Sequence, residues 1–279
     1  MFRVLLCFLV LIGVAGCREA SPPPVSAGEI RIASLSPAIS RAIEDLGLAD
    51  SLVGRSTWCQ LDSLDIDSIP AVGDLHDRDW ERLVRLGPTH VLFQASDVET
   101  DAMLQDLAAR HGWSLHAWPL RTMGEVCNML DDMAGLFTQA EHADEIRIRC
   151  NQRSDEIKAS IKPATRELDV QVLMVSDGQP SLAWGESTYL GEMLASTGAV
   201  NVMGASAWKT ISLEDIVRMN PDVILVVSES EAGDQSFLDG LDLQAIRDNQ
   251  LHHLSHRYIN LPGAHLASLA NQIQSAVID

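Results

Sequence analysis

The sequence predicts an α/β fold made of two similar lobes, joined by a long bridging helix and enclosing a ligand cleft. A helix-then-strand pattern occurs twice, at residues 80–93 and 213–226. Residues 123–162 lie between the two copies and have helical periodicity without a strand pattern. Ligands of open α/β sheets bind beyond the carboxyl ends of the strands, so two facing lobes define one cleft between them.

The two copies of the repeat carry identical Glu, Val, Arg, Pro and Leu residues at the same offsets. In each copy, apolar residues at helical spacing precede a Gly-Pro or Asn-Pro stop, where proline ends the helix. The continuous apolar run that follows is typical of a buried parallel strand. A second, weaker match precedes each copy, because Ile39, Ile43 and Gly47 recur as Leu190, Leu194 and Gly198. The order of both matches indicates a duplication.

The periodicity places strands near 31–35, 52–55, 90–93 and 115–118 in the first unit. In the second unit it places them near 170–175, 223–227 and 258–261. Ser36 and Pro37 form a helix start after the first strand. The bridging helix has room for a break near Thr138 and ends before Pro163. We therefore expect an N-terminal lobe over 30–125, a bridge over 126–162 and a C-terminal lobe over 163–279.

The first residues have the features of an export signal. Arg3 precedes an apolar run over 4–14, too short to span a bilayer, which needs about 20 residues. The run ends in Val14-Ala15-Gly16-Cys17, which resembles a bacterial lipobox. We expect a signal peptide over 1–16, diacylation of Cys17 and a proline-rich tether over 17–29. The expected location is the periplasm or cell envelope, with the chain anchored to a membrane by lipid.

Composition and motifs exclude several classes of function. The formal net charge of −19 argues against nucleic-acid binding, which needs a basic face. The sequence contains no nucleophile elbow, H-E-x-x-H motif, P-loop or G-x-G-x-x-G motif, so we do not expect an enzyme or a bound cofactor. Cys59, Cys127 and Cys150 are odd in number and lack zinc spacing, and no metal site is predicted.

Several short motifs resemble one family across about residues 30–275. They are Leu35-Ser36-Pro37-Ala38, Val53-Gly54-Arg55-Ser56, Val72-Gly73-Asp74 and the paired helix-strand repeats. Together they resemble the helical-backbone periplasmic binding proteins of ABC importers, which carry cobalamin, ferric siderophores, haem and some metals. The likeness is strongest to the cobalamin-binding members. It implies a monomer that delivers a corrinoid ligand to an ABC permease. Haem, a ferric siderophore or a metal is the alternative ligand, and a non-transport sensing lipoprotein or a chelatase-like enzyme is the alternative class.

The same resemblance implies candidate site residues. One glutamate on each lobe of such proteins docks onto the permease, and Glu81 and Glu214 of the repeat occupy these positions. Cleft positions of the family correspond to three tryptophans, which could cover a large flat ligand with their rings: Trp58, Trp184 and Trp208.

Two histidines and one cysteine are further candidates for contact with the ligand. His76 follows the Gly73-Asp74 turn, and His265 follows Pro262-Gly263, which places one imidazole on each lobe. Such a pair could hold an iron or cobalt centre axially. Cys59 lies next to Trp58 and is a third candidate.

Overall fold

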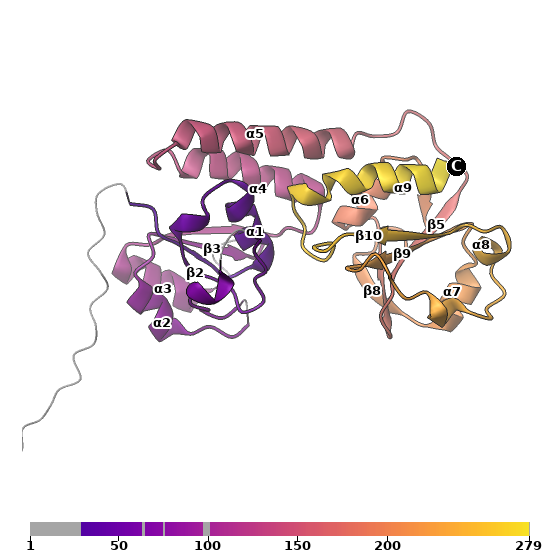
Figure 1. Cartoon of the computed structure of the whole chain (residues 1–279), viewed down its shortest axis with the longest axis horizontal. Helices are drawn as coiled ribbons and strands as arrows, with labels where there is room; N and C mark the ends of the chain where they lie inside the picture. Colours follow the sequence, from indigo (N-terminus) through magenta and orange to yellow (C-terminus); the bar gives the residue numbers. More distant parts are fainter. Residues whose placement is uncertain (1–28, 63–64, 75, 97–100, 279) are drawn as a thin grey trace, which may run out of the picture.

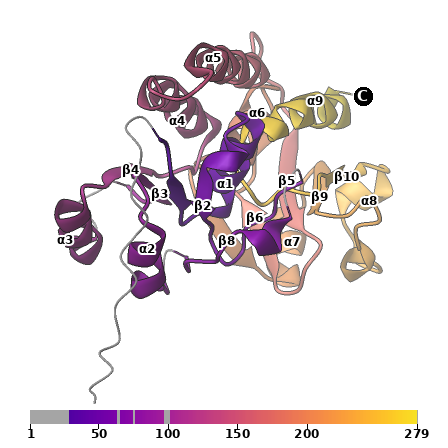
Figure 2. The ribbon, with the colours of Figure 1, turned by 60° about the vertical axis from the view of Figure 1, so that its left-hand side comes forward.

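The computed structural model describes residues 29–62, 65–74, 76–96 and 101–278. Two α/β lobes lie side by side, and helices α4 and α5 run along one edge of the molecule from the N-terminal lobe toward the C-terminal lobe (Figures 1 and 2). The two-lobed α/β fold expected from the repeat is confirmed. The expected signal peptide, Cys17 and residues 17–28 of the tether lie outside the described residues. No helix in the described ranges has both the length and the apolar character needed to cross a membrane.

The N-terminal lobe is built on a parallel four-stranded sheet in the order β2-β1-β3-β4. Its strands are β1 (Ile32–Ser34), β2 (Leu52–Gly54), β3 (His90–Gln94) and β4 (Ser114–Trp118). Its helices are α1 (Pro37–Asp45), α2 (Trp80–Leu86) and α3 (Ala102–His111), with short 3-10 turns η1 (Ala49–Ser51) and η2 (Ile66–Ser68). All four strands lie where the periodicity predicts them.

The C-terminal lobe contains a mixed sheet in the order β10-β9-β5-β6-β8, and β7 also pairs with β5. The strands are β5 (Gln171–Ser176), β6 (Ser181–Trp184), β7 (Val200–Asn201), β8 (Trp208–Ile211), β9 (Val223–Ser228) and β10 (Leu251–Ser255). The helices are α6 (Tyr189–Ala195), α7 (Leu213–Met219), α8 (Gln244–Arg247) and α9 (Leu269–Ile278), with 3-10 turns η4 (Ser236–Leu238) and η5 (Ala264–Ser268). β6 and β8 pair antiparallel, which places β8 at one edge of the sheet.

The strand expected at 258–261 is wrong. The last strand of the sheet is β10, which pairs in parallel with β9, and the chain then turns. The amide of Ile259 donates to the carbonyl of His256, and the amide of Leu261 donates to that of Tyr258. Tyr258 and Ile259 are buried, so their apolar character comes from packing of a turn rather than from a sheet.

The repeat in the sequence is a repeat in the structure. α2 leads into β3 as α7 leads into β9, and each helix begins with a side-chain cap, from Asp79 in one and Ser212 in the other. Each helix ends at a residue in the left-handed region, Gly87 with φ 55° and Asn220 with φ 42°, just before the proline. The two lobes therefore share one helix-strand unit with equivalent ends.

The bridge is helical, but it consists of two helices where one was expected over 126–162. α4 (Met123–Leu136) and α5 (Ala143–Ser160) are joined by a break that includes Thr138, where the sequence leaves room for one. Phe137 leaves the helical region, and its ring packs 5.6 Å from that of His90 in the N-terminal lobe. At the other end of α4, the Glu192 carboxylate on α6 accepts the amides of Met123 and Gly124, at 2.6 and 3.1 Å. α4 is thus attached to both lobes.

One hydrophobic cluster extends through both lobes and the bridge. It joins Ile39 of α1, Met129 of α4, Ile157 of α5, Leu190 of α6 and Ile273 of α9. A second cluster covers the opposite face of the sheet in the C-terminal lobe, and a third does so in the N-terminal lobe. The central cluster makes the bridge part of the core rather than a linker.

Substitution of Gly191 should destabilise the C-terminal lobe. A Cβ atom at this position in α6 would lie 2.0 Å from the Gly185 carbonyl oxygen. We expect Gly191→Ala to lower the free energy of unfolding by about 1–3 kcal/mol, the range for overpacking. Gly135→Ala in α4 is the matched control, because its Cβ meets nothing within 4 Å and alanine favours the helix by about 0.5–1 kcal/mol. Urea denaturation of both variants measures the difference, and equal stabilities would contradict the close approach.

Candidate functional site

The lobes are connected by the carboxylate of Asp62. Its Oδ1 accepts the hydroxyl of Tyr258 at 2.5 Å and a guanidinium N–H of Arg257 at 2.7 Å, both from the C-terminal lobe. Its Oδ2 accepts a guanidinium N–H of Arg41 on α1, in its own lobe, at 2.7 Å. The hydrogen bond from Tyr258 is the main cause that lowers the pKa of Asp62. We call this set of four residues the Asp62 cluster.

The Asp62 cluster is reinforced by a stack of charged and aromatic groups. The guanidinium groups of Arg41 and Arg257 lie 4.7 and 5.0 Å from the centre of the Tyr258 ring. Arg41 also pairs with Glu44 and Asp45 along α1, at 2.7 and 3.0 Å. Tyr258 is 4% exposed and the Arg41 side chain is 14% exposed, whereas the side chains of Arg257 and Asp62 are 69% and 44% exposed. The Arg41 contact is therefore the better shielded of the two cation–π contacts, which strengthen when water is excluded.

His265 lies at the same junction. Its ring stacks on His256 at 5.2 Å and meets Tyr258 edge-on at 5.8 Å. Burial lowers the pKa of His265 to about 4. Nδ1 of this buried ring has no hydrogen-bond partner among the described residues, and Nε2 lies 3.3 Å from the Tyr258 carbonyl. His265 is therefore a neutral, packed imidazole.

Trp58 and His76 of the N-terminal lobe both donate to the carboxylate of Asp74. The Trp58 side chain is 70% exposed, and its Nε1 donates to Asp74 Oδ2 at 3.1 Å. Asp74 Oδ1 accepts the amide of His76 at 2.7 Å. Backbone hydrogen bonds from His76 and Asp77 lower the pKa of Asp74, so it stays ionised. The site has one exposed indole beside a fixed carboxylate, next to a cavity of about 380 Å³.

Cys59, the residue after Trp58, is buried in the core. It is 5% exposed and belongs to the central hydrophobic cluster, and burial raises the pKa of its thiol. A buried thiol of raised pKa is a poor metal ligand, because the thiolate is the ligating form. The structure thus places Cys59 in the core rather than beside Trp58 on the surface.

Trp208 and Trp184 are partners on neighbouring strands of the C-terminal lobe. Trp208 is 37% exposed, and its ring lies 6.1 Å from that of Tyr189. Trp184 is 1% exposed and belongs to the central hydrophobic cluster. Tyr189 beside them donates its hydroxyl to the Ile259 carbonyl at 2.9 Å. In this conformation Trp208 is accessible to a ligand and Trp184 is not.

Glu81 and Glu214 occupy equivalent positions in the first turns of α2 and α7. Their side chains are 86% and 87% exposed, and each pairs with the arginine four residues later. Figure 1 shows both helices at the edge of the molecule opposite α4 and α5, one on each lobe. The two helices that carry the glutamates thus lie on the same side of the molecule.

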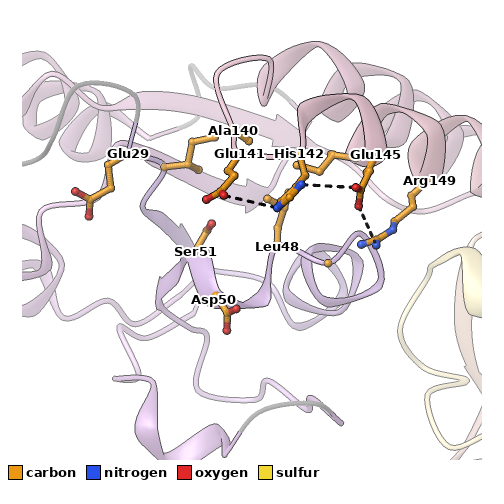
Figure 3. A pocket seen from close by; sticks show the side chains of 12 residues that line it. Glu29, Leu48, Asp50, Ser51, Ala140, Glu141, His142, Glu145 and Arg149 are labelled. Atoms are coloured by element: carbon orange, nitrogen blue, oxygen red, sulfur yellow. Dashed lines mark ion pairs between the residues drawn. The ribbon is translucent and has the colours of Figure 1, made fainter.

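A further cavity, of about 410 Å³, lies away from the junction between the lobes. It is lined by the turn at Leu48 and Ser51 and by the start of α5. In Figure 3, Glu145 lies between His142 and Arg149, at 3.6 and 3.8 Å. No group of three or more His, Cys, Asp or Glu within the described ranges could hold a metal ion.

The Asp62 cluster was missed by the sequence analysis. Asp62 and Arg257 are 195 positions apart, and the turn that carries Arg257 and Tyr258 was interpreted as a strand. β10 ends at Ser255, so Arg257 and Tyr258 follow the carboxyl end of a strand, where residues face the ligand side of such sheets. Correct placement of this strand would have drawn attention to them.

The molecule thus consists of two α/β lobes joined by a helical bridge, and each lobe exposes an aromatic ring. The periplasmic binding protein family model matches residues 32–254. The chain belongs to the periplasmic binding protein family. It is therefore a solute-binding protein of the periplasm or cell envelope, and the family resemblance seen in the sequence is confirmed.

Solved structures support the fold. The periplasmic vitamin B12 binding protein BtuF of Vibrio cholerae has a TM-score of 0.72 at 16% identity, over 88% of this chain and 95% of that one. The periplasmic heme binding protein HutB of Vibrio cholerae has a TM-score of 0.66 at 21% identity, over 88% of this chain and 98% of that one. IsdE of S. aureus, complexed with heme, has a TM-score of 0.65 at 17% identity, over 90% of this chain and 100% of that one. A comparison with curated protein sequences gave no match.

Removal of the Asp62 carboxylate should loosen the lobes while leaving each folded. We expect Asp62→Ala to cost about 1 kcal/mol or less, because Asp62 is partly exposed, yet to broaden the distance between the lobes. Spin labels at Arg85→Cys and Arg218→Cys, at the ends of α2 and α7, measure that distance. The described native thiols Cys59, Cys127 and Cys150 are buried, which favours labelling of the new sites. Asp67→Ala, on the same loop with a 90% exposed side chain, is the control. An unchanged distance distribution in Asp62→Ala would contradict the role of the cluster.

His265 should make the protein less stable in acid. Its folded pKa is about 4, whereas an unfolded histidine titrates near ~6.5. Between these values the unfolded state binds more protons, so stability falls as the pH falls through this window, by about 3 kcal/mol from this residue. His265→Gln should flatten the dependence of unfolding free energy on pH from 7 to 4. The exposed His76→Gln is the control, and parallel pH curves for His265→Gln and the parent would refute the assignment.

Proposed function

We propose that this chain is the lipid-anchored solute-binding component of an ABC importer, which captures a corrinoid between its lobes and delivers it to the permease. The observation that carries the proposal is the matched pair Glu81 and Glu214. Each is nearly fully exposed in the first turn of an equivalent helix, and the two helices lie on one side of the molecule. Two like charges at two lobe tips suit a two-fold partner with complementary arginines, because complementary charges fix the orientation of a complex.

The exposed tryptophans support a large, flat ligand. Trp58 and Trp208 lie on different lobes, and both expose ring surface. Aromatic side chains cover much apolar area at low entropy cost, which suits a tetrapyrrole-like ring.

Electrostatics favours a corrinoid over the anionic alternatives. The ring of a corrinoid is surrounded by neutral amides, whereas haem carries propionates and many ferric siderophores are anionic. The chain has a net charge of −19, and the partner of Trp58 is the ionised Asp74. Such a field repels anions. The vitamin B12 binding protein of Vibrio cholerae shares the fold, as do the heme binders, so the fold leaves both ligands open.

Haem, a ferric siderophore or a metal is the alternative ligand. The exposed His76, beside Trp58, is the observation that favours it, because a neutral imidazole is a common iron ligand. A sensing lipoprotein without a permease, or a chelatase-like activity, would use the same lobes without the docking glutamates.

Anchoring through Cys17 is part of the proposal. The lipobox-like Val14-Ala15-Gly16-Cys17 supports it, and the proline-rich residues 17–29 would serve as the tether to the lipid.

Ligand identity can be measured by titration of the full chain with cyanocobalamin, haemin and a ferric hydroxamate siderophore. We expect cyanocobalamin to quench tryptophan fluorescence and to show a shifted absorbance spectrum. Trp58→Ala and Trp208→Ala should each weaken binding by about tenfold, corresponding to about 1.4 kcal/mol. Trp113→Phe, at a 7% exposed position in the N-terminal lobe, is the control. Quenching by haemin alone would replace the corrinoid with haem, and quenching by none would remove the tetrapyrrole proposal.

A further inference from the structure

The two proposed docking helices are equivalent in backbone but differ in surface. Leu213 and Val217 lie four residues apart on one face of α7, on either side of Glu214 in sequence, and they are 37% and 42% exposed. The equivalent residues of α2 are Trp80 and Val84, and both pack against the core of the N-terminal lobe. We call Leu213, Glu214 and Val217 the α7 patch.

Local packing explains why Trp80 of α2 is less exposed than Leu213 of α7. Trp80 lies under the guanidinium of Arg78, whose carbon is 5.3 Å from the ring centre, and Arg78 pairs with Asp101 at the start of α3. The apolar surface of α2 is thereby covered by neighbouring elements. Leu213 and Val217 keep apolar area in contact with solvent, where burial by a partner would be favourable.

The charges of the two helices also differ. With its cap, α2 carries Asp79, Glu81, Arg82 and Arg85, and two acids against two arginines give a net charge of zero. α7 carries Glu214, Asp215 and Arg218, and two acids against one arginine give −1.

The two glutamates also differ in their ion pairs with arginine. Glu81 contacts Arg85 at 2.6 Å, whereas Glu214 lies 3.6 Å from Arg218, which is shared with Asp215 at 3.1 Å. The Glu214 carboxylate is therefore the less neutralised of the two and the more available to a cation on a partner.

We propose that docking is asymmetric and that the α7 patch makes the stronger contact. Its partner is a basic residue flanked by apolar side chains on the periplasmic surface of the permease, while α2 supplies a weaker, purely polar contact. This inference rests on the proposed function, because it assumes that Glu81 and Glu214 face a permease. Apolar contact around an ion pair excludes water and strengthens it, as at the centres of protein interfaces.

Photo-crosslinking in intact cells tests the proposal without knowledge of the ligand. A photoreactive phenylalanine derivative replaces Val217 in the full lipidated chain, and the adduct is identified by mass spectrometry. We expect an adduct with a transmembrane subunit of an ABC importer, in several-fold greater yield than from the same derivative at Val84. The yield from position 217 should fall about tenfold with Glu214→Ala, about fivefold with Leu213→Ser and at most twofold with Glu81→Ala. Val200→Ser is the matched control, because Val200 is an apolar residue 48% exposed on the same lobe but outside the patch.

The outcomes distinguish a failure of asymmetric docking from a failure of permease docking itself. Equal losses with Glu81→Ala and Glu214→Ala, and no effect of Leu213→Ser, would overturn the asymmetry and leave permease docking intact. An importer adduct that survives the Glu81→Ala, Glu214→Ala double variant undiminished would overturn the role of both glutamates. Absence of any importer adduct from both positions would overturn the proposed function as well.

Discussion

The continuous apolar core beneath α4 and α5 is the constraint on which the rest of the structure depends. Each end of α4 is fixed to a different lobe, through Glu192 on one side and the contact of Phe137 with His90 on the other. Displacement of one lobe would expose part of the central cluster, at roughly 25 cal/mol for each Å² of apolar surface. The Asp62 cluster adds a polar contact at the border of this core. The apolar core and the Asp62 cluster therefore both hold the two lobes in one relative arrangement.

The fold was predictable from the sequence wherever a helix and its following strand were repeated. The E-x-x-V-R pattern and its proline stop identify α2-β3 and α7-β9, because a parallel strand buried on both faces needs a continuous apolar run. β6 and β8 escaped prediction because they are antiparallel additions of four residues each, too short to show a strand periodicity. The strand misplaced at 258–261 shows the opposite failure, since a buried turn has the same apolar composition as a strand.

The candidate site was predictable in type but not in detail. Loop tryptophans pointed to a binding surface, yet nothing in the sequence distinguishes the exposed Trp58 and Trp208 from the buried Trp184. The exposure of each ring depends on which distant residues pack against it, and the local sequence does not specify those tertiary contacts. The contact of Asp62 with Tyr258 joins residues 196 positions apart, so no local periodicity encodes it. The matched glutamates were predictable because they lie inside the repeat.

The position of β8 at the edge of the sheet has a consequence for the chain as a free molecule. An uncovered edge offers unpaired backbone groups to another chain and can seed aggregation. β8 is four residues long and carries the exposed Lys209 next to the exposed Trp208. A charged side chain on a short edge strand disfavours the addition of a second strand. The strand can thus expose an aromatic ring to solvent while its lysine disfavours pairing with the same strand of another copy.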